Sequence, residues 1–185
     1  MKKMGSYINI GSARFANRVM LLFVVVLLSA CLNDDGGGGA TAIVKVGDRV
    51  PDFTLTSTDG QTLSSASLSG QVYILDFFDT RCPDCQQEFK VLQQVYDKYG
   101  QQVPILNVPR SQTREEAQTY WSDANLTMPL YVPHDKDLYY QFATSVIPRT
   151  YVVSAEGKVL AAFSDSPIAD YATLDVLLQQ LLGGR

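Results

Sequence analysis

The stretch DFFDTRCPDC, residues 76–85, decides the fold. It follows the apolar alternation QVYIL of residues 71–75 and leads into residues 83–99, where apolar side chains recur every three or four positions. The first pattern predicts a buried strand and the second an amphipathic helix. Cys82 and Cys85 are therefore expected where a central strand meets the N-terminus of a helix.

This placement makes the two cysteines chemically unequal. Cys82 is expected to cap the helix, with Pro83 at the first helical position, where its missing N–H costs nothing. The free amides and the positive helix end favour the thiolate of Cys82, and the thiolate is the nucleophile. Cys85 lies one turn further on the same side and is expected to be less exposed. We expect Cys82 to attack a disulfide and Cys85 to resolve the mixed disulfide that forms.

Two other uses of a cysteine pair fit the sequence less well. A structural zinc site needs four ligands, and beyond the pair the domain offers one histidine, His134, in a predicted loop. A structural disulfide between residues so close in sequence removes little entropy from the unfolded chain. The pattern therefore favours redox chemistry, and no metal or cofactor is expected.

The remaining pattern alternates strands with helices and shows no internal repeat or second domain. Asp59-Gly60 predicts a hairpin turn in the N-terminal part. Further strands are predicted at 102–109, 128–133, 149–154 and 159–164, and helices at 111–126, 136–144 and 166–182. This order predicts an α/β fold in which helices flank a central mixed β-sheet, with an N-terminal β-hairpin extension.

The N-terminus has the pattern of an export signal. Four basic residues, Lys2, Lys3, Arg14 and Arg18, precede the apolar run VMLLFVVVLLSA of residues 19–30. A run of twelve is shorter than the ~20 residues that span a bilayer but suits a signal peptide. Because LSA precedes Cys31, the segment resembles a bacterial lipobox. We expect residues 1–30 to be a lipoprotein signal peptide, Cys31 to be lipidated, 31–43 to be a Gly-rich tether and 44–185 to be one domain. An ordinary signal peptide or short anchor is the alternative.

Export would change the charge and the surroundings of the chain. Removal of residues 1–30 leaves 11 Lys and Arg against 19 Asp and Glu, a net charge of −8. So acidic a domain is poorly suited to nucleic acid, and its membrane attachment should rest on the lipid. The expected location is the bacterial cell envelope, facing the periplasm or on the outer-membrane surface, where disulfides persist.

Three stretches together resemble the TlpA/ResA branch of the thioredoxin superfamily, which is related to AhpC/TSA proteins. They are VGDRVPDFTLTSTDGQTLSSASLSG, ILDFFDTRCPDCQQEF and SVIPRTYVVSAEGKVLAAF. The resemblance covers residues 44 to 182. It implies a thioredoxin-like fold and an exported or membrane-anchored thiol-disulfide oxidoreductase.

The resemblance also implies roles for residues outside the cysteine pair. Pro148 matches the cis-proline that packs beside the dithiol, and the Ile147 backbone would pair with an incoming peptide. Asp76 matches a buried acid whose pKa is raised and which relays a proton to Cys85. Glu88 stands where the branch often has an acid, although a solvated charge on an exposed helix turn is an equal expectation.

Other positions depart from the family pattern. Arg81 replaces the tryptophan that often precedes the first cysteine, and Lys90 replaces a proline in the helix. Arg81, Pro83 and Asp84 are expected to border the substrate site. Because Arg81 should stabilise the Cys82 thiolate and Asp84 should destabilise it, these residues leave the direction of redox tuning open.

The sequence thus predicts a thiol-disulfide oxidoreductase for exported proteins, acting as a reductant by the family resemblance. Its expected partners are cysteine-containing exported clients and an upstream membrane electron donor. A peroxiredoxin-like peroxidase is the alternative enzyme, but Asp79 and Leu75 occupy the positions where that family has threonine and proline. A non-enzymatic binding lipoprotein with the same fold is the third possibility.

Overall fold

A computed structural model of the chain describes residues 41–183. The predicted signal peptide, the predicted lipidation site Cys31 and most of the predicted tether lie outside these residues. None of the helices in residues 41–183 combines the length and the apolar character that a membrane span requires.

The centre of the fold is a four-stranded mixed sheet. Its strands lie in the order β4 (Ile105–Pro109), β3 (Tyr73–Phe78), β6 (Arg149–Val153) and β7 (Val159–Phe163). The β3–β4 pair is parallel, whereas β6 runs antiparallel to both β3 and β7. Every residue of β3 and β6 is buried. The site residues carried by these two strands are therefore fixed by the core, and the predicted mixed sheet is confirmed.

A second, smaller sheet forms from the predicted N-terminal hairpin. Strands β1 (Thr54–Ser57) and β2 (Thr62–Ser64) pair across a turn at Gly60, whose φ of +89° favours glycine. A distant strand, β5 (Tyr131–Pro133), pairs with the free edge of β1. The 3₁₀ turn η1 (Ser65–Leu68), which the sequence pattern did not predict, follows β2 and is capped by Ser64.

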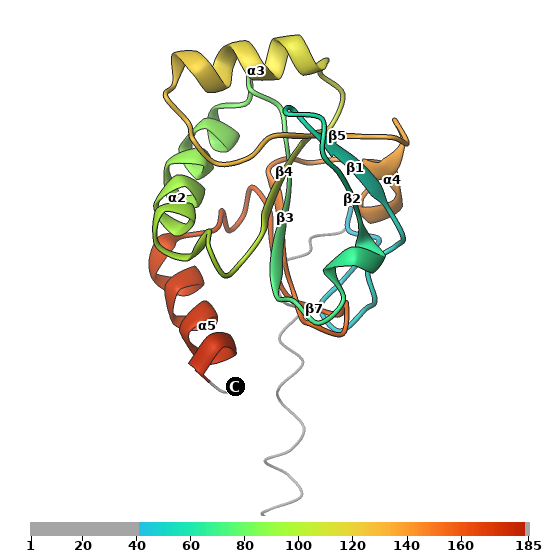
Figure 1. The fold of residues 1–185 in the computed structure, drawn as a ribbon, viewed down its shortest axis with the longest axis vertical. Coiled ribbons are helices and arrows are strands. Elements are labelled where there is room, and N and C mark those ends of the chain that lie inside the picture. The colour runs from blue at the N-terminus through green and yellow to red at the C-terminus, as the bar shows by residue number, and fades with distance from the viewer. Residues whose placement is uncertain (1–40, 184–185) are drawn as a thin grey trace, which may run out of the picture. The chain divides into compact units, whose positions relative to one another are not determined.

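Helices cover the central sheet on both faces (Figure 1). Helices α2 (Pro83–Tyr99), α3 (Arg114–Asp123) and α5 (Tyr171–Gly183) pack with one apolar cluster, and α4 (Leu138–Phe142) packs with the other. The alternation along β3 separates the clusters, since Ile74 and Phe78 belong to the first and Leu75 and Phe77 to the second. Trp121 of α3 stacks on Phe78 with ring centroids 5.0 Å apart.

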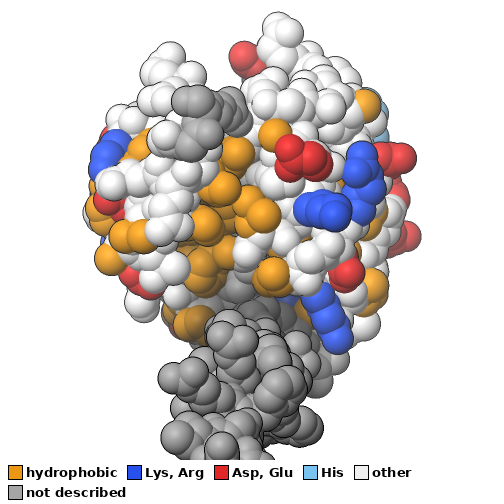
Figure 2. Space-filling model, turned by 90° about the horizontal axis from the view of Figure 1, so that it is seen from below, with side chains coloured by type: hydrophobic (Ala, Val, Ile, Leu, Met, Phe, Trp, Pro, Cys, Tyr) orange, Lys and Arg blue, Asp and Glu red, His pale blue; other side chains and the backbone are white. Residues whose placement is uncertain are grey.

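Helix α5 completes the first cluster. Leu174 and Leu178 are fully buried, while Leu177, Leu181 and Leu182 pack against the same cluster and are partly exposed. Seen from below, the middle of this face carries apolar side chains and the charged ones lie mainly toward its edges (Figure 2). Helix α5 thus contributes to the first cluster chiefly through its leucines.

Candidate active site

The cysteine pair lies at the junction of β3 and α2, as predicted. Cys82 is the N-cap of α2 in an extended conformation, and Pro83 is its first residue. The Cys82 side chain is partly exposed, whereas Cys85 is fully buried, and both are free thiols. Burial raises the pKa of Cys85 and the neighbouring Cys82 thiol adds to this shift, so the two thiols lie close together. One thiol is therefore accessible, with the second directly behind it.

The loop before β6 faces the accessible thiol. The Ile147–Pro148 peptide bond is cis, which confirms the prediction for Pro148. The Sγ of Cys82 donates to the carbonyl oxygen of Ile147 at 3.7 Å. Ile147 is half-buried and Pro148 is buried. The backbone of Ile147 thus borders the only cysteine of the pair that solvent can reach.

Asp76 and Glu88 lie under the dithiol. Asp76 is fully buried, as predicted, but the expectation of a solvated Glu88 is wrong, because its side chain is 1% exposed. The hydroxyl of Thr150 lies 2.8 Å from Glu88 Oε1 and 3.3 Å from Asp76 Oδ1. Glu88 faces inward because it follows Cys85 by about one helical turn and shares its buried side of α2.

The two carboxyl groups influence each other and the resolving thiol. Burial and the neighbouring charge of Glu88 raise the pKa of Asp76 well above its usual range. Burial also raises the pKa of Glu88. Asp76 Oδ2 and Glu88 Oε2 have no donor among the described groups, so a proton held between them would satisfy both. Burial raises the pKa of the Cys85 thiol, and the negative charge of the nearby Asp76 raises it further. Loss of the Cys85 proton therefore needs a nearby base.

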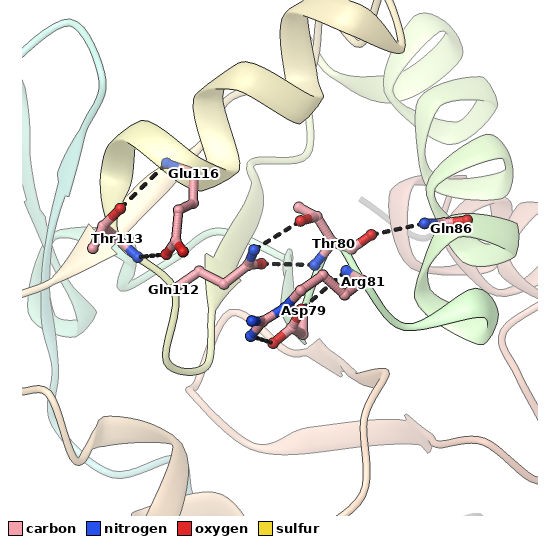
Figure 3. A network of polar contacts seen from close by, with 7 residues as sticks. All are labelled: Asp79, Thr80, Arg81, Gln86, Gln112, Thr113 and Glu116. Atoms are coloured by element: carbon pink, nitrogen blue, oxygen red, sulfur yellow. Dashed lines mark hydrogen bonds and ion pairs between the residues drawn. The ribbon is translucent and has the colours of Figure 1, made fainter.

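A network of hydrogen bonds fixes the loop in front of Cys82 (Figure 3). The side-chain amide of Gln112 accepts from the Thr80 backbone N–H at 2.7 Å and donates to the Thr80 hydroxyl at 2.8 Å. Gln86 of α2 donates to the Thr80 carbonyl at 2.8 Å. The backbone N–H, the carbonyl and the hydroxyl of Thr80 are thereby all hydrogen-bonded, and these bonds restrain the backbone directly before Arg81 and Cys82.

Arg81 takes part in the same network through Asp79. Its guanidinium makes a two-pronged contact with the Asp79 carboxylate, at 2.9 and 2.7 Å, and this pairing lowers the pKa of Asp79. Arg81 remains largely exposed. The Arg81 guanidinium thus pairs with Asp79, and no hydrogen bond joins the Arg81 side chain to Cys82 in the described structure. Pro83 and Asp84 lie beside Cys82 on the first turn of α2, where the sequence placed them.

Other residues singled out in the sequence have structural positions. His134 is exposed and hydrogen-bonds the Thr56 hydroxyl at 2.6 Å, at the edge of the smaller sheet. Lys90 lies on an exposed side of a continuous α2. Among residues 41–183, no three His, Cys, Asp or Glu side chains gather in an arrangement that could hold a metal.

The central mixed sheet, the dithiol at a helix N-terminus and the facing cis-proline define a thioredoxin-like protein. The model of the AhpC/TSA family matches residues 46–162, so the chain belongs to that family. Within the thioredoxin superfamily it is a TlpA/ResA-like member.

Several proteins that are similar to this chain are named for thiol-disulfide exchange. The thiol-disulfide oxidoreductase ResA of Bacillus subtilis (strain 168) is 25% identical over 136 residues, which are 71% of this chain and 76% of that protein. A crystal structure of a thio-disulfide isomerase from Thermus thermophilus is 30% identical, with a TM-score of 0.60, and covers 73% of this chain and 96% of its own. A thiol:disulfide interchange protein from Chlorobium tepidum TLS is 24% identical, with a TM-score of 0.63, over 74% of this chain and 97% of that one.

Sequence reasoning missed the residues that join the site together. Thr150 and Gln112 are polar residues with no distinctive motif around them, and each finds its partners only when distant segments meet. One signal was available for Thr150. It lies in a strand whose residues alternate between the two faces of the sheet, and it pairs with Asp76 across the sheet. No pattern in the sequence marks Gln112.

Proposed function

We propose that this chain is a thiol-disulfide oxidoreductase that reduces disulfides in exported proteins, with Cys82 as the attacking thiol and Cys85 as the resolving thiol. The observation that carries the proposal is the arrangement of an accessible Cys82 against the Ile147 backbone with a buried Cys85 behind it. The names of the relatives support the same reaction class.

The proposed reaction has two thiol exchanges. The Cys82 thiolate attacks one sulfur of the client disulfide, forms a mixed disulfide and expels the other client sulfur as a thiolate. Cys85 then gives its proton to the carboxylate pair of Asp76 and Glu88 and attacks the Cys82 sulfur. The second client sulfur leaves, and two electrons have passed from the dithiol to the client. An upstream dithiol donor restores Cys82 and Cys85.

The reducing direction of the proposal rests on the resemblance of the chain to the TlpA/ResA branch.

Attachment to the cell envelope is part of the proposal. The order of basic, apolar and small residues before Cys31 supports export and lipidation at that cysteine. Incubation of cells with a radiolabelled fatty acid should label the wild type and leave Cys31→Ser unlabelled. Equal labelling of both would refute lipidation at this cysteine.

The direct test of the reaction is reduction of insulin disulfides by the full-length protein in mild detergent, with a dithiol as electron source. The wild type should accelerate insulin precipitation, and Cys82→Ser should not. Equal rates would refute the proposed function. Cys85→Ser should accumulate a mixed disulfide on Cys82 in cells, from which mass spectrometry would identify the client.

A further inference from the structure

Arg149, the residue directly after Pro148, is a buried cation without a carboxylate partner in the part of the chain that the structure describes. Its side chain is 1% exposed and belongs to the apolar face on which Phe77 is its cross-strand neighbour. The ion pairs found among residues 41–183 do not include Arg149. A buried charge without such a partner is unfavourable, and an apolar side chain would fill this space at lower cost. Arg149 therefore needs an explanation other than packing.

The guanidinium of Arg149 contacts the loop that faces the dithiol. Its Nη2 donates to the Ser145 carbonyl at 3.4 Å and to the Thr41 hydroxyl at 2.9 Å. Beside it, the buried Tyr139 hydroxyl donates to the Val146 carbonyl at 2.7 Å. The two carbonyl groups before Ile147 are thus both held from the interior.

These contacts hold an unusual backbone conformation. Val146 has a φ of +73°, in the left-handed region that a β-branched residue rarely adopts. Such a conformation persists only where the surroundings enforce it. It determines the direction of the next residue, Ile147, whose carbonyl lies 3.7 Å from the Sγ of Cys82.

A second segment restrains the same loop from its other side. The carbonyl of Thr41 accepts from the backbone N–H of Thr144 at 2.9 Å, and Ala42 forms a β-bridge with Ala143. Arg149 joins the two segments, because its Nη2 reaches both the Thr41 hydroxyl and the Ser145 carbonyl.

We propose that Arg149 and Tyr139 are positioning residues that hold residues 145–147 so that the Ile147 backbone can pair with an extended client peptide beside Cys82. The inference rests on the proposed function and concerns recognition of the peptide. A client strand gains affinity from main-chain hydrogen bonds to such an edge, whereas a small disulfide does not need them. Arg149 and Tyr139 therefore act on peptide binding and not on the sulfur chemistry.

The test compares two substrates with the full-length protein. One is a disulfide-bonded peptide and the other is dithiodipyridine, a small neutral disulfide. In Tyr139→Phe and Arg149→Met, kcat/KM for the peptide should fall about tenfold through KM, equivalent to about 1.4 kcal/mol. The rate with dithiodipyridine should stay within twofold. Tyr73→Phe is the matched control, since its hydroxyl is buried, has no hydrogen-bond partner among the described residues and lies at the far end of β3, opposite Val153. It should change neither rate.

The outcomes separate this inference from the function on which it rests. An equal loss on both substrates, or no loss on either, would overturn the positioning role while the wild-type activity stands. Tyr139→Phe keeps the ring and removes one hydroxyl, so it remains informative if Arg149→Met fails to fold. A wild type that reacts with neither substrate through Cys82 would refute the proposed function and this inference with it.

Discussion

Asp76 and Glu88 place two carboxyl groups in one buried space under the dithiol, where both contact the hydroxyl of Thr150. A single hydroxyl hydrogen cannot satisfy both groups, and two negative charges so close in the interior repel each other. The pair should therefore keep a proton at a pH where isolated carboxyl groups have lost theirs. Because the pKa values of the two carboxyl groups are raised, the pair is better suited to accept the proton of Cys85 than an ordinary carboxylate would be.

Replacing Glu88 by Gln should stabilise the reduced folded protein at alkaline pH. Burial raises the pKa of Glu88 to about 7, so between the ordinary pKa and this value the folded chain keeps a proton that the unfolded chain loses. Wild-type stability therefore falls as pH rises through that window. The advantage of Glu88→Gln should grow from near zero at about pH 4 to roughly 1–3 kcal/mol at about pH 8. Urea unfolding measures it, with the exposed Glu115→Gln as control, and a pH-independent difference would contradict the prediction.

Replacing Asp76 by Asn should slow the resolving step. The amide cannot accept the Cys85 proton, and a general base typically contributes 10²–10⁴-fold, part of which Glu88 can still supply here. Release of a thiol peptide from a preformed mixed disulfide at Cys82 should slow by about tenfold or more near neutral pH. Asp97→Asn, on an exposed part of α2, is the control. Unchanged release in Asp76→Asn would remove this carboxyl from the proton path.

The two cysteines should differ in their reaction with an alkylating reagent. Cys82 is partly exposed and Cys85 is fully buried. In the native reduced protein, iodoacetamide should modify Cys82 at least tenfold faster, because Cys85 lacks both access and thiolate character. Peptide mass mapping after a short pulse gives the ratio, and denaturation should abolish it. Comparable native labelling would contradict the buried position of Cys85.

Loss of the Gln112 side chain should weaken the loop before Cys82. Gln112→Ala leaves the buried backbone N–H of Thr80 without its acceptor, and such a loss costs about 1–3 kcal/mol. The free energy of unfolding should fall by that amount, whereas Gln118→Ala, exposed on α3, should change it by less than about 0.5 kcal/mol. Denaturant titration of both variants provides the comparison. Equal stabilities would show that the network does not hold the loop.

Local patterns in the sequence were sufficient to predict the principal elements. The alternation before Cys82 and the three- and four-residue spacing after it predicted β3 and α2, because burial on a pleated strand and on one helix face leaves different periods. Asp59-Gly60 likewise predicted the turn between β1 and β2. Such signals involve residues that are neighbours along the chain.

Features that depend on contacts between distant parts of the chain were harder to predict from the sequence. The burial of Glu88 arises because Thr150 comes from β6 to meet the α2 face, and an acidic residue on a helix carries no local mark of this contact. The pairing of β5 with β1 joins residues more than seventy positions apart. Arg149 resembles an ordinary charged residue in the sequence, although the strand that contains it is fully buried. These errors concern tertiary partners and not local conformation.

The stacking of Trp121 on Phe78 gives the protein an intrinsic optical reporter. Trp121 is the single tryptophan of the chain, and it also contacts Phe89 in α2, the helix that Cys82 caps and that contains Cys85. Selective excitation of its indole therefore records the packing under the dithiol without any added label. Fluorescence can follow oxidation and reduction of the protein in real time, in detergent or on a membrane.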